Sequence, residues 1–549
     1  MAAARERESG VLSRGVLLLL FTAFLGASLV VYRPALDGPP IADDFAYLVN
    51  PWLTSPDPRL LVEVLDPTSQ ATRTLRNFAP VRGLLHALEW RLFPENAVAY
   101  HTTNLLAHAL ATTLLVAFFA RLGVRPVAAA LAGWLFLLHP ANVEAVAWMS
   151  QLWSPVALAF SILALLALPR RPGLASLAFV LALGSKPLAL FALPTAIVLE
   201  RCRTRERGAG SSEPPAHWGW IAAWAVLCAA QAVAQLSAAA GSGHEGPLHP
   251  DLGVELRAMA TFAFRYLVMG ATSFGVSAFQ EPPLPLSPWD PWWLASAGVL
   301  ALLGWRLLVT WRKRSPEAAG WLWALAAFAP VSQVFPFLYP MADRYLYFML
   351  PGLLLAGALA LQDGLARLSD TRWRRGLWRA AGAAALALAL VFAARSASRA
   401  ALWRSEDALL RDAAAHFPDG VSSCLLRSRR AAQAGDVEGA IAPLREAAAR
   451  GWDWYDFLLT HPAYVRVRED PRFRAWLREL AAQRIAKGRR GLRMTQLDWL
   501  QDADAHLLRG ETREAAESLE RGLALGGPLD AQLRARRAQL ATAPAAGSG

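Results

Sequence analysis

Cysteine is almost absent from this chain of 549 residues, which contains only Cys202, Cys228 and Cys424. Their spacing matches neither a disulfide framework nor a cysteine metal site. Charged residues are also scarce at 18%, whereas 55% of the residues are hydrophobic and the mean hydropathy is +0.28. This balance excludes a soluble enzyme of this size and predicts a protein whose solvent is the lipid bilayer.

Acidic residues are outnumbered by basic ones, and the net charge is +12. The arginines stand in short clusters between apolar runs, so they indicate membrane topology and exclude a nucleic-acid partner. With these clusters in the cytoplasm, the pattern predicts a cytoplasmic N-terminus and about eleven spans. The run near 258–276 is one too many for that topology, and we interpret it as re-entrant or interfacial. Val16–Tyr32 is interpreted as a retained anchor.

The C-terminal third has no apolar run of membrane length and is rich in Ala, Arg, Leu and Glu. One pattern occurs in it twice with identical spacing: Gly435, Ala440, Leu444 and Gly451, then Gly510, Ala515, Leu519 and Gly526. Such spacing is typical of helical-hairpin repeats. We therefore predict an all-α chain with a polytopic membrane domain (1–394), a soluble tetratricopeptide-like domain (395–540) and a disordered tail (541–549).

Two adjacent carboxylates, Asp43 and Asp44, follow the first predicted span. Such a pair can provide a general base and a metal or hydroxyl ligand, although an isolated pair is more often a helix N-cap in a solvated loop. Arg82 lies in the same predicted outward loop. These three residues are the first of several polar positions that the predicted topology places on the outer side of the membrane.

A second polar group lies within a predicted span, where His101, Asn104 and His108 are spaced i, i+3 and i+7. One helix face carries all three, which predicts that this face meets a wet cavity or hydrogen-bonds to another helix. His139 and Glu144 then flank a proline break at the next outward turn.

Cations stand at two further outward breaks: Lys186 before Pro187, and Arg344 beside Tyr345. Snorkelling and interfacial anchoring are the structural alternatives for these residues. Because the polar residues recur at four breaks on one side, we favour a single extracytoplasmic polar cavity. Acids combined with Lys and Arg suit a reaction in which a sugar leaves a phosphate.

The order of these motifs resembles the GT-C superfamily of membrane glycosyltransferases, and most closely its transmembrane-and-tetratricopeptide O-mannosyltransferase-like family with bacterial relatives. The residues that carry the resemblance are Asp43-Asp44, Arg82 in Pro-Val-Arg, His101-x-x-Asn104-x-x-x-His108, His139-Pro140 through Trp148, Ser185-Lys186 and Arg344-Tyr345-Leu346-Tyr347. Three positions depart from the family pattern: Asn142 replaces a second His, Pro187 an acid, and Ser154-Pro155 an Arg-Lys-Asp-like element.

The resemblance implies transfer of a sugar, with mannose as the first expectation, from a polyprenyl-phosphate donor to a hydroxyl of a protein or glycan. It implies Asp43 and Asp44 as catalytic residues, with a divalent metal ion, if one is used, at the same pair. The substrate-binding residues would be Arg82, His101, His108, His139, Glu144, Lys186, Arg344 and Tyr345. Which aspartate is the base, which sugar is moved and which acceptor is used stay open.

Residue usage favours the bacterial inner membrane, with the active site and the repeats in the periplasm; the endoplasmic reticulum membrane would be topologically equivalent. The predicted partners are the bilayer, the lipid-linked sugar, the acceptor and proteins that dock on the repeats. The alternative function is a non-catalytic membrane scaffold that recruits envelope-assembly partners. A transporter is disfavoured because the polar residues gather on one side of the membrane instead of at its midplane.

Overall fold

The computed structural model describes residues 12–206, 216–239, 247–334, 337–488 and 494–542. These residues are all-helical, with 78% helix and no strand apart from one isolated bridge between Gln280 and Met341. The all-α prediction is therefore confirmed for them. The predicted disordered tail (541–549) is wrong at residues 541 and 542, because they form the end of a helix, and the rest of it lies outside the described residues. The arginines at positions 5 and 7 also lie outside them.

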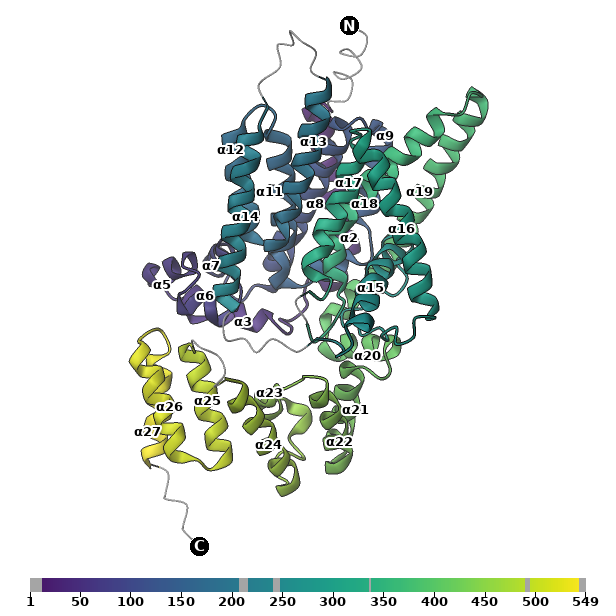
Figure 1. Cartoon of the computed structure of the whole chain (residues 1–549). Coiled ribbons are helices and arrows are strands. Elements are labelled where there is room, and N and C mark those ends of the chain that lie inside the picture. The colour runs from purple at the N-terminus through teal and green to yellow at the C-terminus, as the bar shows by residue number, and fades with distance from the viewer. Residues whose placement is uncertain (1–11, 207–215, 240–246, 335–336, 489–493, 543–549) are drawn as a thin grey trace. The chain divides into compact units, whose positions relative to one another are not determined.

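Seven helical segments in the described part of the chain are long and apolar enough to cross a membrane (Figure 1). They are α2 (Arg14–Val31), α8 (Ala97–Arg121), η3 with α11 (Met149–Ala167), α14 (Trp218–Ala239), α16 (Pro291–Arg312), α18 (Asp343–Ala366) and α19 with η6 (Thr371–Arg404). Three shorter apolar helices accompany them: α9 (Pro126–Leu137), α12 (Pro172–Ser185) and α17 with η5 (Glu317–Val331). A helical membrane protein is thus supported, whereas the count of about eleven spans stays a prediction.

The middle apolar run forms α15 (Leu252–Thr272), which is not among the seven candidate spans. Its Tyr266 hydroxyl donates to Ala342 O (3.2 Å) and accepts from Ala342 N (3.0 Å). Its Gly270 carbonyl lies 3.2 Å from His139 Nε2. Ala342 directly precedes α18, and His139 follows α9. The helix α15 therefore packs against the start of α18 and the end of α9.

Two glycines allow α17 and α18 to pack backbone against backbone. A Cβ atom on Gly352 would lie 2.6 Å from Gly320 O and 2.8 Å from Ala324 N. The same crowding applies to Gly320, whose Cβ would lie 2.6 Å from Gly352 O. Close approach of this kind is the usual way in which membrane helices gain packing energy, since lipid offers no hydrophobic drive for their association.

The chain divides into two compact units. The first comprises residues 1–45, 92–231 and 247–409, and the second comprises 46–91, 232–246 and 410–549. In the first unit η1 (Arg33–Ala35) follows α2, and α10 (Asn142–Ala147), η4 (Pro187–Phe191) and α13 (Ala192–Glu206) complete the bundle. The predicted border at 394/395 falls inside α19, whose helix continues to Ala400.

The second unit joins short N-terminal helices to a series of C-terminal ones. The short helices are α3 (Asp44–Leu48), which starts in the first unit, α4 (Pro51–Thr54), α5 (Pro58–Val62), η2 (Glu63–Leu65), α6 (Gln70–Thr74) and α7 (Pro80–Leu92). The C-terminal helices are α20 (Glu406–His416), α21 (Val421–Ala434), α22 (Val437–Ala449), α23 (Tyr455–Thr460), η7 (Pro462–Tyr464), α24 (Pro471–Gly488), α25 (Gln496–Arg509), α26 (Thr512–Leu525) and α27 (Asp530–Thr542). Gln70 connects the two sets, since its Nε2 donates to Gly526 O (2.8 Å) and its Oε1 accepts from Gln496 N (3.0 Å).

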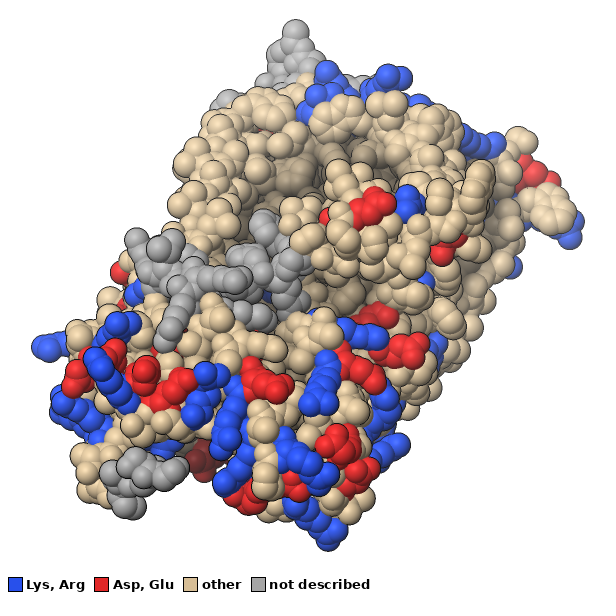
Figure 2. Space-filling view, turned by 60° about the horizontal axis from the view of Figure 1, so that its bottom comes forward, with Lys and Arg blue, Asp and Glu red and all other residues tan. Residues whose placement is uncertain are grey.

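The repeated sequence pattern corresponds to two helical hairpins, α21–α22 and α25–α26. Gly435 and Gly510 end the first helix of each hairpin at φ of +83° and +80°, a conformation that glycine adopts without strain. The alanine and leucine positions of both copies are fully buried: Ala440, Leu444, Ala515 and Leu519. Lys, Arg, Asp and Glu are interspersed on the surface of the second unit (Figure 2). A tetratricopeptide identity for these hairpins stays a prediction.

Replacing Gly352 by alanine should destabilise the bundle, because the added methyl group meets backbone atoms that cannot rotate away. Overpacking costs about 1–3 kcal/mol. Gly357→Ala is the matched control on the same helix, since nothing lies within 4 Å of its Cβ position. We expect a lower unfolding temperature in detergent for Gly352→Ala only. Equal shifts in both variants would show that the two helices do not approach this closely.

Candidate functional site

The site is built on a buried polar segment between α9 and α11. Pro140 cannot continue a helical hydrogen-bond pattern, so α9 ends at Leu137 and the chain folds into the short helix α10 and the 3₁₀ turn η3. Every residue of α10 is buried. Backbone carbonyls that this break releases are hydrogen-bonded by a side chain of α8: Asn104 Nδ2 donates to Val146 O (3.1 Å) and Trp148 O (2.9 Å).

The two adjacent aspartates have different environments. Asp44 is 2% exposed; its Oδ2 accepts from Ile41 N (2.9 Å) and its Oδ1 from Ser150 N (2.8 Å). Asp43 is exposed. Asp44 therefore anchors the loop after α2 to η3, while the neighbouring carboxylate is accessible to solvent.

The backbone before this pair is strained. Ala42 has φ of +51°, a left-handed conformation that costs a residue with a Cβ roughly 1–2 kcal/mol. Trp148 adds a second tie, since its Nε1 donates to Ile41 O (3.1 Å). Strained residues of this kind persist where the surroundings hold them in place, and they are common at functional sites.

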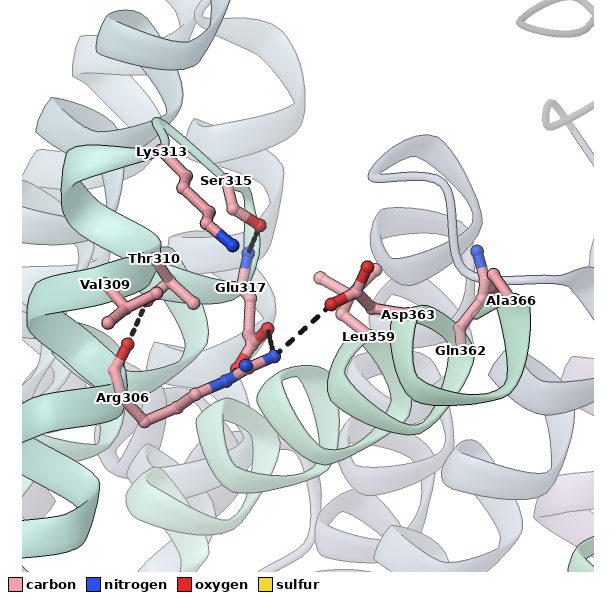
Figure 3. A pocket seen from close by; sticks show the side chains of 10 residues that line it. All are labelled: Arg306, Val309, Thr310, Lys313, Ser315, Glu317, Leu359, Gln362, Asp363 and Ala366. Atoms are coloured by element: carbon pink, nitrogen blue, oxygen red, sulfur yellow. Dashed lines mark hydrogen bonds and ion pairs between the residues drawn. The ribbon is translucent and has the colours of Figure 1, made fainter. Parts of the chain in front are cut away.

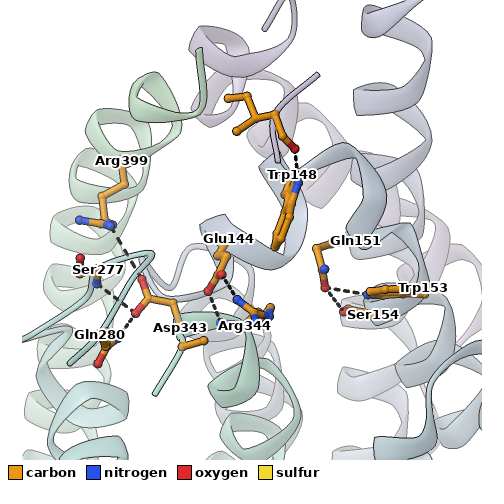
Figure 4. A network of polar contacts seen from close by, with 12 residues as sticks. Glu144, Trp148, Gln151, Trp153, Ser154, Ser277, Gln280, Asp343, Arg344 and Arg399 are labelled. Atoms are coloured by element: carbon orange, nitrogen blue, oxygen red, sulfur yellow. Dashed lines mark hydrogen bonds and ion pairs between the residues drawn. The ribbon is translucent and has the colours of Figure 1, made fainter. Parts of the chain in front are cut away.

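An ion pair joins α10 to the start of α18 (Figure 4). Glu144 is 2% exposed; its Oε2 accepts from Arg344 N (2.7 Å), and its Oε1 accepts from Arg344 Nη1. The guanidinium lies 4.9 Å from the centre of the Tyr345 ring and 5.6 Å from that of Trp148. About a quarter of the Arg344 side chain is exposed (24%). Arg344 thus has donor groups available for an anionic ligand.

A second carboxylate at the start of α18 is held differently. Asp343 Oδ1 accepts from Ser277 N (3.1 Å) and from Gln280 Nε2, and Oδ2 lies 3.8 Å from Arg399 Nη2 (Figure 4). Asp343 was not predicted as a site residue. Its position next to Arg344 in the sequence does not determine the direction of either side chain. It connects the loop after α15 and the helix α19 to the first turn of α18.

Lys186 contacts both polar and aromatic side chains. Its Nζ donates to Ser154 Oγ (2.9 Å) and to Gln151 Oε1 (3.4 Å), and it lies 5.4 Å and 5.2 Å from the ring centres of Trp153 and Phe348. Gln151 also accepts from Trp153 Nε1 (2.6 Å; Figure 4). Sequence reasoning missed Gln151, although its position between two tryptophans in a buried turn was a usable signal. Phe348, which Lys186 contacts, is one helical turn beyond Arg344. Both cations therefore lie near the N-terminal end of α18.

The histidines have mainly structural partners. His108 pairs with the Tyr347 hydroxyl through Nδ1 (2.9 Å) and with Leu137 O through Nε2 (3.1 Å). His139 Nδ1 accepts from Ala141 N (3.1 Å), while Nε2 pairs with Gly270 O. The contacts of His108, which join α8 to α18 and α9, agree with the helix–helix hydrogen bonding that was the alternative interpretation of its helix face. His101 is 3% exposed, and neither of its buried ring nitrogens has a hydrogen-bond partner.

Arg82 belongs to the second unit, where it is 1% exposed and its guanidinium lies 4.7 Å from the centre of the Tyr47 ring. The remaining nine predicted site residues all lie in the first unit.

The residues offer little for a metal ion. Across the described ranges there is no group of three or more His, Cys, Asp and Glu side chains that could hold one. Each oxygen of Asp44 already accepts a backbone N–H group, so Asp43 would be the main ligand of any ion at the predicted position. We therefore derive no step through a metal.

A cavity of about 410 Å³ lies at the opposite end of α18, near Asp363 (Figure 3). Arg306 donates to both oxygens of Glu317 (2.7 Å each) and lies 3.7 Å from Asp363. These ion pairs join the cavity walls that α16, α17 and α18 form. The 24 residues of α18 span about 36 Å as a helix, which separates this cavity from Arg344.

Comparison with known proteins identifies no relative: no protein-family model, curated protein or solved structure matches the chain.

Replacing Asp44 by asparagine should lower stability, because one carbonyl oxygen cannot accept from both Ile41 N and Ser150 N. One buried N–H group would then face an amide NH2, at a cost of about 1–3 kcal/mol. Asp43→Asn is the matched control, and at an exposed position it should change stability by no more than about 0.5 kcal/mol. Thermal unfolding of the purified variants measures both. Similar unfolding temperatures would contradict the assigned difference in environment.

Proposed function

We propose that this chain is a membrane glycosyltransferase that moves a sugar from a polyprenyl-phosphate donor to a hydroxyl group of a protein or glycan. The observation that carries the proposal is an exposed carboxylate, Asp43, beside a fixed one, Asp44. Trp148 joins their loop to the site, since its Nε1 donates to Ile41 O and the Arg344 guanidinium lies over its ring. The order of motifs that resembles the GT-C glycosyltransferases supports the same class. A periplasmic site, or an equivalent one in the endoplasmic reticulum lumen, belongs to the proposal.

In the proposed reaction Asp43 acts as the general base. Its carboxylate takes the proton of the acceptor hydroxyl while that oxygen attacks the anomeric carbon of the donor sugar. The bond from this carbon to the phosphate oxygen breaks, and its electron pair leaves with the polyprenyl phosphate. Attack from the side opposite the phosphate inverts the anomeric configuration.

The departing phosphate carries the charge that develops in this step, and cations stabilise it. Lys186 can supply an ammonium charge, which lies beside the Ser154 hydroxyl and the Gln151 side-chain oxygen. Arg344 can supply guanidinium N–H donors, although Glu144 offsets its charge. In this assignment Asp44 positions the loop and does not touch the substrate.

Turnover by the purified protein in nanodiscs is the direct test, with a panel of polyprenyl-phosphate sugars that includes the mannose donor and with release of polyprenyl phosphate as the readout. Asp43→Asn should lower the rate about 100- to 10,000-fold, which corresponds to about 3–5 kcal/mol of transition-state stabilisation. Donor binding should persist, because the cations are unchanged.

Asp37→Asn is the matched control, since Asp37 is an exposed acid in the same loop that forms a surface ion pair with Arg404 (2.9 Å). Losing such a pair costs at most about 1 kcal/mol of stability, and we expect normal transfer. Near-normal transfer by Asp43→Asn would overturn the assigned base. If the wild-type protein turns over no member of the panel, the alternative function, a scaffold that recruits partners through its repeats, becomes the better explanation.

A further inference from the structure

The cavity near Asp363 lies within the first unit and takes no part in the proposed reaction (Figure 3). Its walls come from the last two turns of α16 and of α18, from the first residue of α17 and from the loop between α16 and α17. The volume of about 410 Å³ falls in the range of about 300–1,000 Å³ that is usual for small-molecule sites. This cavity is therefore large enough to hold a ligand of its own.

Ion pairs and hydrogen bonds hold the walls of this cavity in place. Arg306 of α16 donates to both oxygens of Glu317, so the charges of these two residues offset each other. Gln362 of α18 donates to Gly123 O (2.9 Å) and accepts from Arg125 N (3.2 Å), which ties α18 to the turn between α8 and α9. The cavity is thus preformed, as ligand sites usually are.

Two further charged side chains, of opposite sign, line the cavity. Lys313 directly follows α16 and is exposed, and the side chain of Asp363 on α18 is 52% exposed. Figure 3 shows these two residues on opposite sides of the cavity. Asp363 pairs with Arg367 (2.6 Å) and lies 3.7 Å from Arg306. Because half-exposed ion pairs contribute little net stability, a cationic group of a ligand can compete for this carboxylate.

The balance of charge indicates which kind of ligand the cavity fits. Its lining contains two cations, Arg306 and Lys313, and two anions, Glu317 and Asp363. A ligand with a single sign of charge would meet as much repulsion as attraction, whereas a zwitterion finds a partner for each of its groups. Ser315 Oγ accepts from Glu317 N (3.3 Å), so its hydroxyl can donate to a phosphate oxygen beside the Lys313 ammonium.

The surroundings of the cavity are those of lipid head groups. Both α16 and α18 are candidate spans, and the ends of a span lie at the boundary between hydrocarbon and water. Trp305 and Leu308 of α16 and Leu361 of α18 are exposed large apolar side chains. Arg312 and Arg314, which are also exposed, stand at the end of α16. A polar cavity next to exposed apolar helix surface suits a ligand that has both a charged head and acyl chains.

We propose that this cavity binds the head group of a zwitterionic phospholipid with a primary ammonium group, as in phosphatidylethanolamine. Lys313 and Ser315 bind the phosphate, Asp363 accepts from the ammonium, and the acyl chains lie on the exposed apolar surface of α16 and α18. Phosphatidylcholine carries the same two charges but no ammonium N–H donor, so it lacks the bond to Asp363. This inference goes beyond the proposed function and does not depend on it.

Native mass spectrometry of the delipidated full chain in detergent tests the proposal. Phosphatidylethanolamine, phosphatidylcholine and phosphatidylglycerol with identical acyl chains are titrated onto the wild type and three variants. Lys313→Gln removes the partner of the phosphate, and Asp363→Asn removes the partner of the ammonium. Arg312→Gln is the matched control, because it removes one positive charge from an exposed neighbour that does not line the cavity. The unfolding temperature of each variant verifies that it is folded.

We expect the wild type to bind phosphatidylethanolamine about tenfold more tightly than the other two lipids, because only its head group supplies both a phosphate and N–H donors. Lys313→Gln should weaken binding of phosphatidylethanolamine and phosphatidylglycerol about tenfold. Asp363→Asn should remove the preference for phosphatidylethanolamine and leave phosphatidylglycerol binding unchanged or tighter, since a negative charge leaves the cavity. Arg312→Gln should bind all three lipids as the wild type does.

Three results would overturn the proposal. Tighter binding of phosphatidylglycerol than of phosphatidylethanolamine by the wild type would show an anion site. An unchanged lipid preference in Asp363→Asn, or equal losses in Lys313→Gln and Arg312→Gln, would place the lipid outside the cavity. Excess soluble phosphoethanolamine distinguishes a lipid from a free metabolite. The bound lipid should stay in its presence, whereas displacement at equal affinity would show that the apolar surface of α16 and α18 takes no part.

Discussion

In the first unit, the arrangement of the candidate site depends on the contact between Glu144 and the first turn of α18. A carboxylate in an apolar interior must have hydrogen-bond donors, and Glu144 finds both of its own in Arg344, one on the backbone and one on the side chain. This contact fixes α10 against α18 and places Trp148 beside the guanidinium. Trp148 in turn holds Ile41, which holds the loop of the two aspartates. Removing one partner of such a buried pair typically costs about 3–5 kcal/mol.

Much of the helical organisation was predictable, because the cost of exposing backbone groups to lipid forces long apolar runs into helices. The runs near Val16, Tyr100 and Trp293 correspond to α2, α8 and α16. The repeated glycines were equally informative, since Gly435 and Gly510 end helices in conformations that few other residues adopt. Domain borders were harder to infer. Residues 46–91 group with the C-terminal helices through contacts such as those of Gln70, whose hydrogen bonds join positions more than 400 residues apart in sequence.

The candidate site was predictable in its residue types and less so in its partners. Burial of Asn104, His108 and Glu144 follows from the cost of polar groups facing lipid. The difference between Asp43 and Asp44 does not follow from sequence, because adjacent residues point in different directions according to a local backbone that is itself strained at Ala42.

The strain at Ala42 and the fixed carboxylate of Asp44 belong together physically. A left-handed alanine relaxes unless the residues on both sides are held, and here Ile41 is held by Trp148 and by Asp44 itself. The hydrogen bonds of Asp44 therefore fix the backbone from which Asp43 projects. A carboxylate positioned in this way can remain solvated, as a base must to reach an acceptor, without losing its direction. The positioning residue, Asp44, is buried and takes no part in the proposed chemical step.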